Sequence, residues 1–463
     1  MNVNRREFLT GATALTVFGW RRLAVAAGYP EYWGDSLARA AARTKALAAD
    51  CADGFWFITD LHISHNRCRS GQLLAELVRR SPLDRVLCGG DLPVAFSEGF
   101  KGDREAVDFA VSKYANDWVK PIRAAGGKVY TAKGNHDFTV CRSYKTPETR
   151  KLGFTYDGRK AREIVVGNST ERDVVSNPAD PTACYYYFDR PEAGLRYVVA
   201  DTSDTERAGD NPWGVVYGIH ETQYKWLAGT ALATVPAGYD VVFMHHIPVA
   251  GVVSSEGPKR FAKMRELLEA YQNRGVFAVG DAKYDFAAAT GRILLDLTGH
   301  EHCDMWTFQR GVLHVTDSSD AYGDAERSKP WSGDLPPKKG GTAAEQTFDA
   351  VQFDRRRRLV YFTRVGGGQD RVCHLDALSA KVGATLKLEA KLLKGPLTWG
   401  CYDADRVDEK KSPKSRWSTL PAYHNDFATI GPDGALAAKK PGEVVVLAMD
   451  AKLNKEIFPV TII

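Results

Sequence analysis

The segment FWFITDLHIS, residues 55–64, runs from a short apolar stretch directly into polar residues. Large aromatic and β-branched side chains in such a run favour a buried β-strand. Asp60 and His62 follow two positions apart, so in an extended chain both side chains project to the same side. The same change from apolar to polar recurs in RVLCGGD (85–91), KVYTAKGNHD (128–137), LRYVVADTSD (195–204), DVVFMHH (240–246) and RILLDLTGHEH (292–302). We therefore predict a series of strands that each end in polar side chains.

Helical patterns separate several of these runs. The sequence predicts an alanine-rich helix over 36–49, an amphipathic helix over 70–81, and a longer helical segment over 103–127 that closes on two glycines. Strand, helix and strand in alternation are typical of an α/β fold. In such sheets ligands bind beyond the carboxyl ends of the strands. The predicted fold class is therefore α/β, with its polar strand ends well placed for one shared site.

The character of the sequence changes after residue 320. A polar loop rich in proline and glycine leads into a predicted hairpin over 347–371, with its turn at 354–358. Beyond residue 375 the helical periodicity is lost, and short alternating strands are separated by Gly/Pro turns. This pattern predicts a small all-β sandwich after the α/β domain.

The bulk composition is ordinary for a globular protein of more than one domain. The chain has 463 residues, of which 44% are hydrophobic and 26% charged. The 62 basic and 57 acidic residues nearly balance, which gives no electrostatic argument for nucleic acid or an anionic membrane as a partner. The eight cysteines form no C-x-x-C pair and no dense disulfide framework.

The N-terminus places paired arginines ahead of a short apolar stretch. Arg5 and Arg6 precede the apolar residues 9–20, and the small residues 24–26 offer a cleavage site. The stretch is too short for a transmembrane span. This arrangement resembles a twin-arginine export signal over residues 1–27, which implies an exported, periplasmic or extracellular protein. The alternative is a disordered or helical N-terminus of a cytoplasmic protein.

The polar residues at the strand ends supply the donor set of a two-metal site. Divalent ions take imidazole, carboxylate and amide-oxygen ligands. One carboxylate can bridge two ions about 3.5–4 Å apart, the spacing that activates water for attack on phosphorus. The motifs arrive in the order D-x-H, G-D, G-N-H-[DE], H and G-H-x-H, and together they are far more specific than any one of them. They contribute Asp60, His62, Asp91, Asn135, His136, Asp137, His245, His300 and His302.

These motifs resemble those of the calcineurin-like metallophosphoesterase superfamily, and the resemblance covers residues 51–371. It implies an αββα sandwich of two sheets and hydrolysis of a phosphoric ester by a hydroxide that bridges two metal ions. The implied ligands are Asp60, His62 and His302 for the first metal, Asn135, His245 and His300 for the second, and Asp91 as the bridge. His136 would contact the scissile phosphate and protonate the leaving oxygen, with Asp137 as its supporting partner.

Polar residues next to these motifs are interpreted as structural. We take His246, beside His245, as a structural neighbour rather than a contact to a ligand or substrate. His65 and Arg67 are assigned to a solvated loop rather than to phosphate binding. Asp201 is placed where capping a turn is at least as well supported as reaching the site.

The metals and the substrate are predicted only by class. Purple acid phosphatases of the same superfamily carry a tyrosine ligand three residues after the bridging aspartate, where this chain has Val94. An iron–tyrosinate centre is therefore disfavoured, and the expected cofactors are two divalent ions of Mn, Zn or Fe. The expected substrate is a phosphorylated small molecule or a glycan or lipid phosphoester. Monoester and diester hydrolysis remain equal alternatives, because both chemistries use the same metal ligands.

The C-terminal segment FATIGPDGALAAKKPGEVVVLAMDA, residues 427–451, resembles a bacterial immunoglobulin-like domain of the group-2 type, as in invasin and intimin. The resemblance implies contact with a cell surface, and a packed accessory sandwich of the enzyme is the equal alternative. The predicted organisation is a signal peptide (1–27), a helical segment (28–50), a metallophosphoesterase domain (51–374) and an Ig-like sandwich (375–463). The rival function is a surface or adhesive binding protein whose phosphoesterase domain is an inactive scaffold.

Overall fold

A computed structural model gives the fold of the chain and describes it in nine stretches. These are residues 30–63, 69–92, 103–137, 139–141, 152–204, 218–250, 261–321, 338–402 and 426–463. The predicted export signal lies outside them, as do His65, Arg67 and Val94. Across these stretches we find no helix with both the length and the apolar character that crossing a membrane requires.

Helices occupy the segments that the periodicity indicates. The helix α2 confirms the predicted alanine-rich helix, and α3 confirms the amphipathic one. The predicted segment 103–127 forms a nearly continuous run of α4, η2 and α5. The helical elements are η1 (Glu31–Trp33), α2 (Gly34–Ala48), α3 (Ser70–Arg80), α4 (Asp103–Lys113), η2 (Tyr114–Val119), α5 (Lys120–Ala124), α6 (Gly158–Arg162), η4 (Glu163–Asn168), α7 (Glu221–Trp226), η5 (Leu227–Leu232), α9 (Ala262–Gln272) and η7 (Ala343–Glu345).

The larger sheet joins the first strands of the chain to its last. Its strands are β1 (Asp53–Ile58), β2 (Arg85–Cys88), β3 (Lys128–Thr131), β15 (Thr347–Asp354), β16 (Leu359–Gly366), β17 (Arg371–His374), β18 (Leu378–Ala380), β20 (Thr398–Tyr402), β23 (Gly442–Met449) and β24 (Lys455–Ile462). Their order is β20-β23-β24-β17-β16-β15-β1-β2-β3, with β18 on β24. Strands β1, β2 and β3 run parallel, so their carboxyl ends meet at one edge. The predicted hairpin is confirmed as β15 and β16.

The second sheet supplies the other strand ends. Its strands are β6 (Val175–Ser176), β7 (Tyr186–Arg190), β8 (Leu195–Val199), β9 (Asp240–Met244), β12 (Ile293–Thr298), β13 (Met305–Gln309) and β14 (Val312–Thr316). Their order is β13-β14-β12-β9-β8-β7-β6, and β8, β9, β12 and β14 are parallel to one another. Small pairs lie outside the two sheets: β4 (Thr139–Cys141) with β5 (Leu152–Thr155), and β10 (Val276–Val279) with β11 (Ala282–Asp285).

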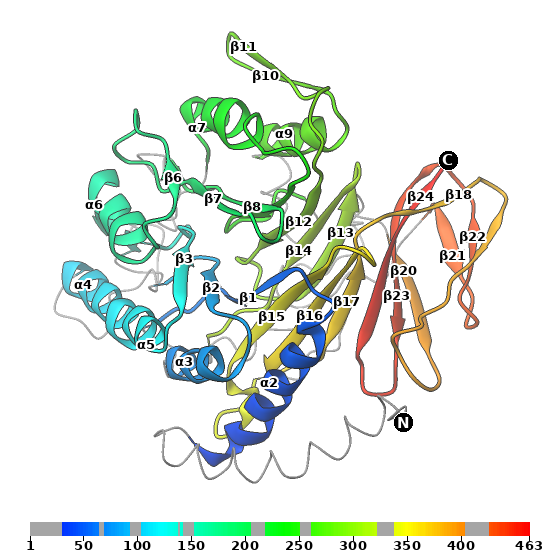
Figure 1. Cartoon of the computed structure of the whole chain (residues 1–463), viewed down its shortest axis with the longest axis horizontal. Helices are drawn as coiled ribbons and strands as arrows, with labels where there is room; N and C mark the ends of the chain where they lie inside the picture. The colour runs from blue at the N-terminus through cyan, green and yellow to red at the C-terminus, as the bar shows by residue number, and fades with distance from the viewer. Residues whose placement is uncertain are drawn as a thin grey trace.

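The two sheets face each other and helices cover their outer faces (Figure 1). Rings of Phe55 on β1 and Tyr197 on β8 meet edge to face with centroids 5.6 Å apart, at the centre of the core between the sheets. A second core packs α7 and α9 behind the second sheet. Strand β1 is buried along its whole length because layers cover both of its faces. The predicted α/β fold of two facing sheets flanked by helices is therefore confirmed.

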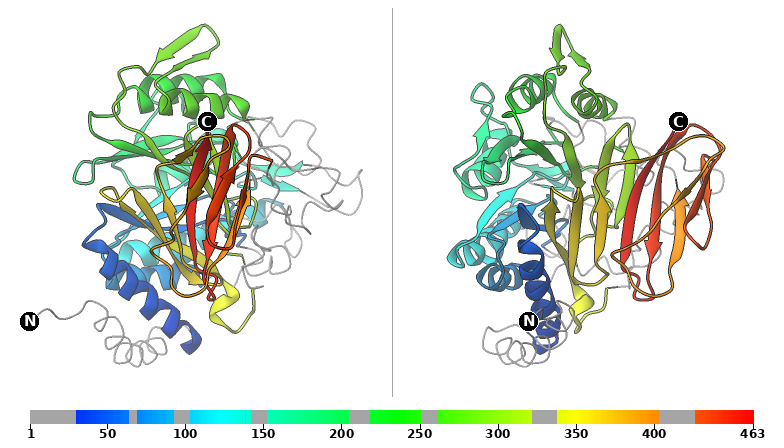
Figure 2. Two further views of the ribbon diagram at one scale, coloured as in Figure 1. Left: turned by 90° about the vertical axis from the view of Figure 1, so that its right-hand side faces the viewer. Right: turned by 45° about the vertical axis from the view of Figure 1, so that its right-hand side comes forward.

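The chain ends in a β-rich region, as predicted. Three short strands, β19 (Thr385–Lys387), β21 (Ala428–Ile430) and β22 (Ala435–Ala438), form a sheet that packs on β23 and β24 around a separate apolar core. Strand β24 also pairs in parallel with β17, so one sheet crosses the predicted boundary at residue 374. Figure 2 shows these terminal strands, in red, alongside the yellow strands of the larger sheet. The Ig-like assignment and the boundary itself stay predictions.

Candidate metal centre

The polar strand ends of both sheets converge. Asp60, Asp91 and Asn135 lie just beyond β1, β2 and β3 of the larger sheet. His246 lies just beyond β9, and His300 and His302 lie in the turn between β12 and β13 of the second sheet. Because the parallel strands of each sheet point the same way, all of these side chains collect at one end of the molecule.

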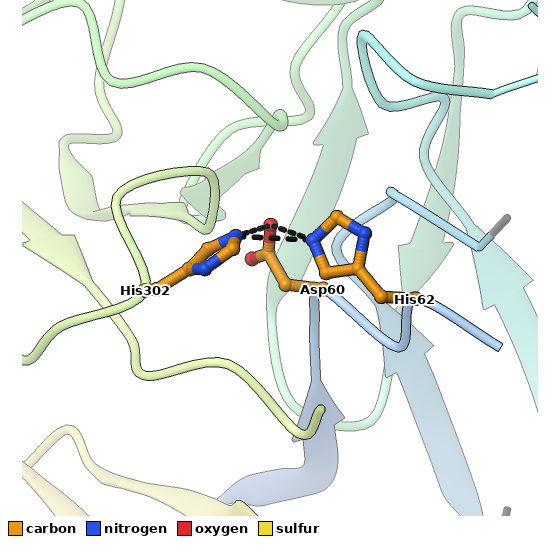
Figure 3. Close-up of side chains that lie close together, drawn as sticks. All are labelled: Asp60, His62 and His302. Carbon is orange, nitrogen blue, oxygen red and sulfur yellow. Dashed lines mark hydrogen bonds and ion pairs between the residues drawn. The ribbon is translucent and has the colours of Figure 1, made fainter. Parts of the chain in front are cut away.

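Asp60, His62 and His302 form the first group of side chains able to hold a metal ion. Their ligand atoms lie within 4.8 Å of one another. Nε2 of His302 lies 3.1 Å from Oδ1 of Asp60, and Nε2 of His62 lies 3.8 Å from the same oxygen. Figure 3 shows the three side chains pointing toward one point from two separate loops. The sequence predicts these three residues as ligands of one metal, and the structure brings them together.

Asp91, His246 and His300 form the second group, also within 4.8 Å. Oδ2 of Asp91 lies 3.2 Å from Nε2 of His246. The rings of His246 and His300 meet edge to face with centroids 5.2 Å apart. Oδ1 of Asn135 lies 2.7 Å from Nδ1 of His300, so the predicted amide ligand is beside this group.

The two groups lie side by side with the carboxylates between them. Oδ2 of Asp91 lies 3.9 Å from Nε2 of His62, a member of the first group. Oδ1 of Asp60 lies 3.9 Å from Nε2 of His246, a member of the second. Asp91 therefore faces both groups, which is the placement that a bridging carboxylate needs.

The expectation that His245 belongs to the second group is wrong. Nε2 of His245 lies 2.7 Å from Oδ1 of Asp296, and its Nδ1 lies 2.9 Å from the carbonyl oxygen of Ile247. Both ring nitrogens thus face partners away from the groups, and His246 takes the place predicted for His245. Strand alternation explains the error. Met244 packs between the sheets, so His246, two positions on, continues that face while His245 falls on the other.

His136 and Asp137 contact the groups in different ways. The backbone N–H of His136 donates to Oδ1 of Asp91 at 2.9 Å, and the His136 ring lies edge to face with His62 at 5.8 Å. The two carboxylate oxygens of Asp137 accept the backbone N–H groups of Leu92 and Gly134, each at 2.6 Å. Asp137 therefore ties the loop after β3 to the loop after β2, and its predicted support of the His136 ring stays a prediction.

Nearly every residue of the two groups has a positive φ angle. Non-glycine residues rarely adopt positive φ, although Asp and His do so more readily than most. Nine described non-glycine residues have positive φ, and five of them belong to the groups. These are Asp60 (52°), His62 (39°), Asp91 (55°), His300 (72°) and His302 (56°). Strain of about 1–3 kcal/mol per residue persists only where surrounding structure holds it, and it marks functional sites.

Glycines allow the loops to approach this closely. A Cβ on Gly299 would lie 2.0 Å from Oγ1 of Thr59, and a Cβ on Gly134 would lie 2.2 Å from the backbone nitrogen of Asp91. Neither position has space for a side chain. Thr59 also donates to Oδ2 of Asp60 at 2.8 Å, which fixes the carboxylate. Thr59 belongs to none of the motifs that predict the site.

The carboxylates are held ionised in spite of burial. Burial raises the pKa of Asp91, but the imidazoles of His246 and His136 outweigh it and hold the pKa well below its usual range. Burial opposes protonation of His246, but Asp91 and Asp60 raise its pKa to about 9. Burial and the charge on His246 lower the pKa of His300 to about 3. Anionic carboxylates and a neutral His300 are the forms that bind cations, and a divalent ion would displace the proton of His246.

The donor set fits divalent metal ions. Oδ1 of Asp60 is buried without a hydrogen bond, and Nε2 atoms of His302, His62 and His246 surround it at 3.1, 3.8 and 3.9 Å. The Nε2 atoms of His62 and His302 also lie 3.1 Å from each other, and a cation held by Asp60, His62 and His302 would accept the lone pairs of all three side chains. Imidazole, carboxylate and amide oxygen together suit Mn, Zn or Fe.

The chain matches one family model and is similar to several solved structures. The model of the calcineurin-like phosphoesterase family matches residues 54–304, more than half of the chain. No curated protein matches the chain. Solved structures similar to it include a dimetal phosphatase from Danio rerio, with 16% identity, a TM-score of 0.44, and coverage of 70% of this chain and 99% of that one. Another is phosphopantetheinyl hydrolase from Mycobacterium tuberculosis, with 13% identity, a TM-score of 0.32, and coverage of 61% and 95%.

Proposed function

The chain belongs to the calcineurin-like phosphoesterase family and is a metal-dependent phosphoesterase, and from this premise we propose how its site works. Asp60, His62 and His302 would hold one divalent ion. His246, His300 and Asn135 would hold the other, and Asp91 would contact both. The chemistry that two such ions would supply is a hydroxide for attack on phosphorus and neutralisation of the charge that develops on the phosphoryl oxygens.

One observation carries this proposal. Two groups of three ligand-type side chains lie next to each other, and the ligand atoms within each lie within 4.8 Å. They come from four separate segments of two different sheets, and a fold has no packing reason to bring so many buried imidazoles and carboxylates together.

We assign proton donation to His136. Its backbone N–H is fixed on Asp91, and its ring lies beside His62 at the edge of the first group. Burial lowers the pKa of His136 to about 4, so the free ring is neutral at neutral pH. The negative charge of a phosphoester beside it favours the imidazolium, which then gives its proton to the leaving oxygen.

The substrate and the location of the protein are proposed by class. A phosphorylated small molecule or a glycan or lipid phosphoester fits the chemistry, with Mn, Zn or Fe as the metals. Export to the periplasm or beyond rests on residues 1–27, which lie outside the described residues. The rival function, an adhesive protein on an inactive scaffold, would tolerate loss of ligands. Both groups retain theirs, which favours the enzyme.

The deciding experiment compares two esters. The purified chain is loaded with Mn, Zn or Fe, and initial rates are measured on bis-(p-nitrophenyl) phosphate and p-nitrophenyl phosphate. Turnover that a chelator abolishes and added metal restores is expected, and the faster ester identifies the bond class. If the chain binds no metal and hydrolyses neither ester, the inactive-scaffold function replaces the enzyme.

A further inference from the structure

A cluster of buried charges lies directly behind the turn that carries His300 and His302. It consists of two arginines and three aspartates, none more than 3% exposed: Arg364, Arg371, Asp304, Asp317 and Asp349. All but Asp304 lie outside the segment matched by the family model. Burying so many charges is unfavourable unless each is paired, so the cluster calls for a structural explanation.

Arg364 is the centre of this cluster. Its Nη2 donates to both carboxylate oxygens of Asp304, at 2.7 and 2.8 Å, and lies 3.0 Å from Oδ1 of Asp317. Oδ2 of Asp349 lies 3.1 Å from the same nitrogen. One guanidinium nitrogen on β16 of the larger sheet thus contacts three carboxylates. Two of them, those of Asp304 and Asp317, lie in loops of the second sheet.

Two of those carboxylates belong to segments that carry or contact metal ligands. Asp304 closes the turn that begins at Gly299, and its Oδ1 also accepts the backbone N–H of Ser318 at 3.2 Å. Asp317 begins the segment after β14, and its N–H donates to the carbonyl of Thr298 at the end of β12. The same segment reaches the first group, because Oγ of Ser319 donates to the carbonyl oxygen of Asp60 at 3.1 Å.

Residues of the C-terminal β region contact Trp306, which lies beside this cluster. Both terminal nitrogens of Arg371 donate to the carboxylate of Asp349, at 3.1 and 2.7 Å. The guanidinium of Arg371 also lies over the ring of Trp306. The ammonium of Lys455, on β24, lies over the same ring at 5.7 Å. The hydroxyl of Tyr402, on β20, donates to the carbonyl oxygen of Trp306 at 2.7 Å. Trp306 follows Asp304 closely, so the terminal strands support the same turn.

We propose that Arg364 is a positioning residue that fixes the turn bearing His300 and His302 through Asp304, with the C-terminal strands as its outer support. This inference rests on the proposed metal centre. The turn holds two residues with positive φ, and a strained turn keeps its shape only if packing and hydrogen bonds determine it. Arg364 supplies that constraint from the opposite sheet, and no uncharged side chain could pair with three carboxylates at once.

The test replaces Arg364 by lysine, which keeps the charge and loses the planar arrangement of donors. The matched control is Arg196→Lys, because Arg196 is buried like Arg364 and donates to both oxygens of Asp189 at 2.7 Å. Arg196 lies at the start of β8, the end of the strand away from the groups. The Kd of Mn²⁺ is measured by equilibrium dialysis with elemental analysis. Arg364→Lys should weaken binding about 10–100-fold, while Arg196→Lys should change it by less than about twofold.

A second readout does not depend on metal. Hydrogen exchange of peptides covering 298–306 is followed in metal-free protein, where Arg364→Lys should speed exchange in this turn and Arg196→Lys should not. Unchanged exchange and unchanged Kd in a folded Arg364→Lys protein would overturn the proposal. If the wild-type chain binds no metal, the proposed function fails, and the exchange measurement still decides the role of Arg364.

Asp304→Asn provides an independent variant should Arg364→Lys not fold. The single substitution should also weaken Mn²⁺ binding, and the double variant should be no weaker than the worse single one, because both act through one contact. If the losses of Mn²⁺ affinity of the two single variants add in full, Arg364 does not act through Asp304, which would contradict the proposal.

Discussion

Two buried carboxylates, Asp60 and Asp296, both lie among histidines, and their surroundings differ. Asp296 divides its oxygens between two rings, with Oδ1 2.7 Å from Nε2 of His245 and Oδ2 2.6 Å from Nδ1 of His314. Asp60 instead has three imidazole nitrogens around one oxygen, the nearest being Nε2 of His302 at 3.1 Å. Each oxygen of Asp296 thus faces a single ring nitrogen, and His314 makes a hydrogen bond to Oδ2. Around Asp60, in contrast, several ring nitrogens face one oxygen, which is the arrangement that suits a cation.

The backbone differs in the same way. Asp296 and His314 are direct partners in the ladder between β12 and β14, in regular extended conformation. Asp60, His62 and His302 lie in loops with positive φ. The identity of the residues therefore does not distinguish a structural ion pair from a metal site. The two kinds of site differ in the number of ring nitrogens around one carboxylate oxygen and in the backbone strain at the residues that carry these atoms.

The largest effect is expected from removing the carboxylate that faces both groups. Asp91→Ala should lose metal and lower kcat/KM by at least ~10⁴-fold, because residues that act as one unit fail together. Elemental analysis and initial rates of the same preparation check this. Two equivalents of metal still bound to the variant would remove Asp91 from its bridging role.

His136→Ala should affect catalysis without affecting metal. The ring contacts the groups only from the side, so both ions should remain, while kcat should fall by roughly 10²–10⁴-fold through loss of the proton donor. The fall should be smaller for an ester with a good leaving group, such as p-nitrophenolate, than for an alkyl ester. Near wild-type kcat on the alkyl ester would exclude the assigned role.

Asp296→Asn should affect stability without abolishing metal binding. Removing one partner of a buried ion pair costs about 3–5 kcal/mol. Burial raises the pKa of Asp296, but His245 and His314 outweigh it and hold the pKa below its usual value. The stabilisation is therefore fully present above about pH 4, the unfolded value, and declines as pH falls from there to the lower folded pKa. The difference between the two proteins in urea unfolding should be large at pH 7 and smaller at pH 3, and a difference that grows at pH 3 would contradict this sign.

The smallest effect is expected at the edge of the C-terminal region. Tyr402→Phe removes one buried hydrogen bond to the carbonyl oxygen of Trp306 and should lower the free energy of unfolding by about 1 kcal/mol. Metal affinity should change little. A loss of metal binding larger than that of Arg364→Lys would show that the terminal strands, rather than Arg364, position the turn.

The sequence predicts the site residues whose position follows from the local sequence alone. The step from an apolar strand to polar residues predicted Asp60, Asp91, Asn135 and the turn bearing His302, because parallel strands bring their carboxyl ends together. The pair of adjacent histidines after β9 was assigned wrongly. Only one of the two histidines can face the site, and which one depends on the face of β9 that packs against the other sheet. The strand DVVFM is apolar on both faces, so its sequence does not indicate which face that is.

Other features depend on contacts between distant segments. Asp304 and Arg364 are 60 positions apart, and nothing near either residue indicates the other. The parallel pairing of β17 with β24 likewise joins segments that composition assigned to separate domains. Local periodicity predicts which strands form, but it carries no information on which strand becomes the neighbour of which.

The most direct test is a crystal structure of the manganese-loaded chain with anomalous difference maps recorded near the manganese edge. We expect two peaks about 3.5–4 Å apart, one bounded by Asp60, His62 and His302 and the other by Asp91, His246 and His300. A single peak, or a peak between His245 and Asp296 in place of the second, would contradict it.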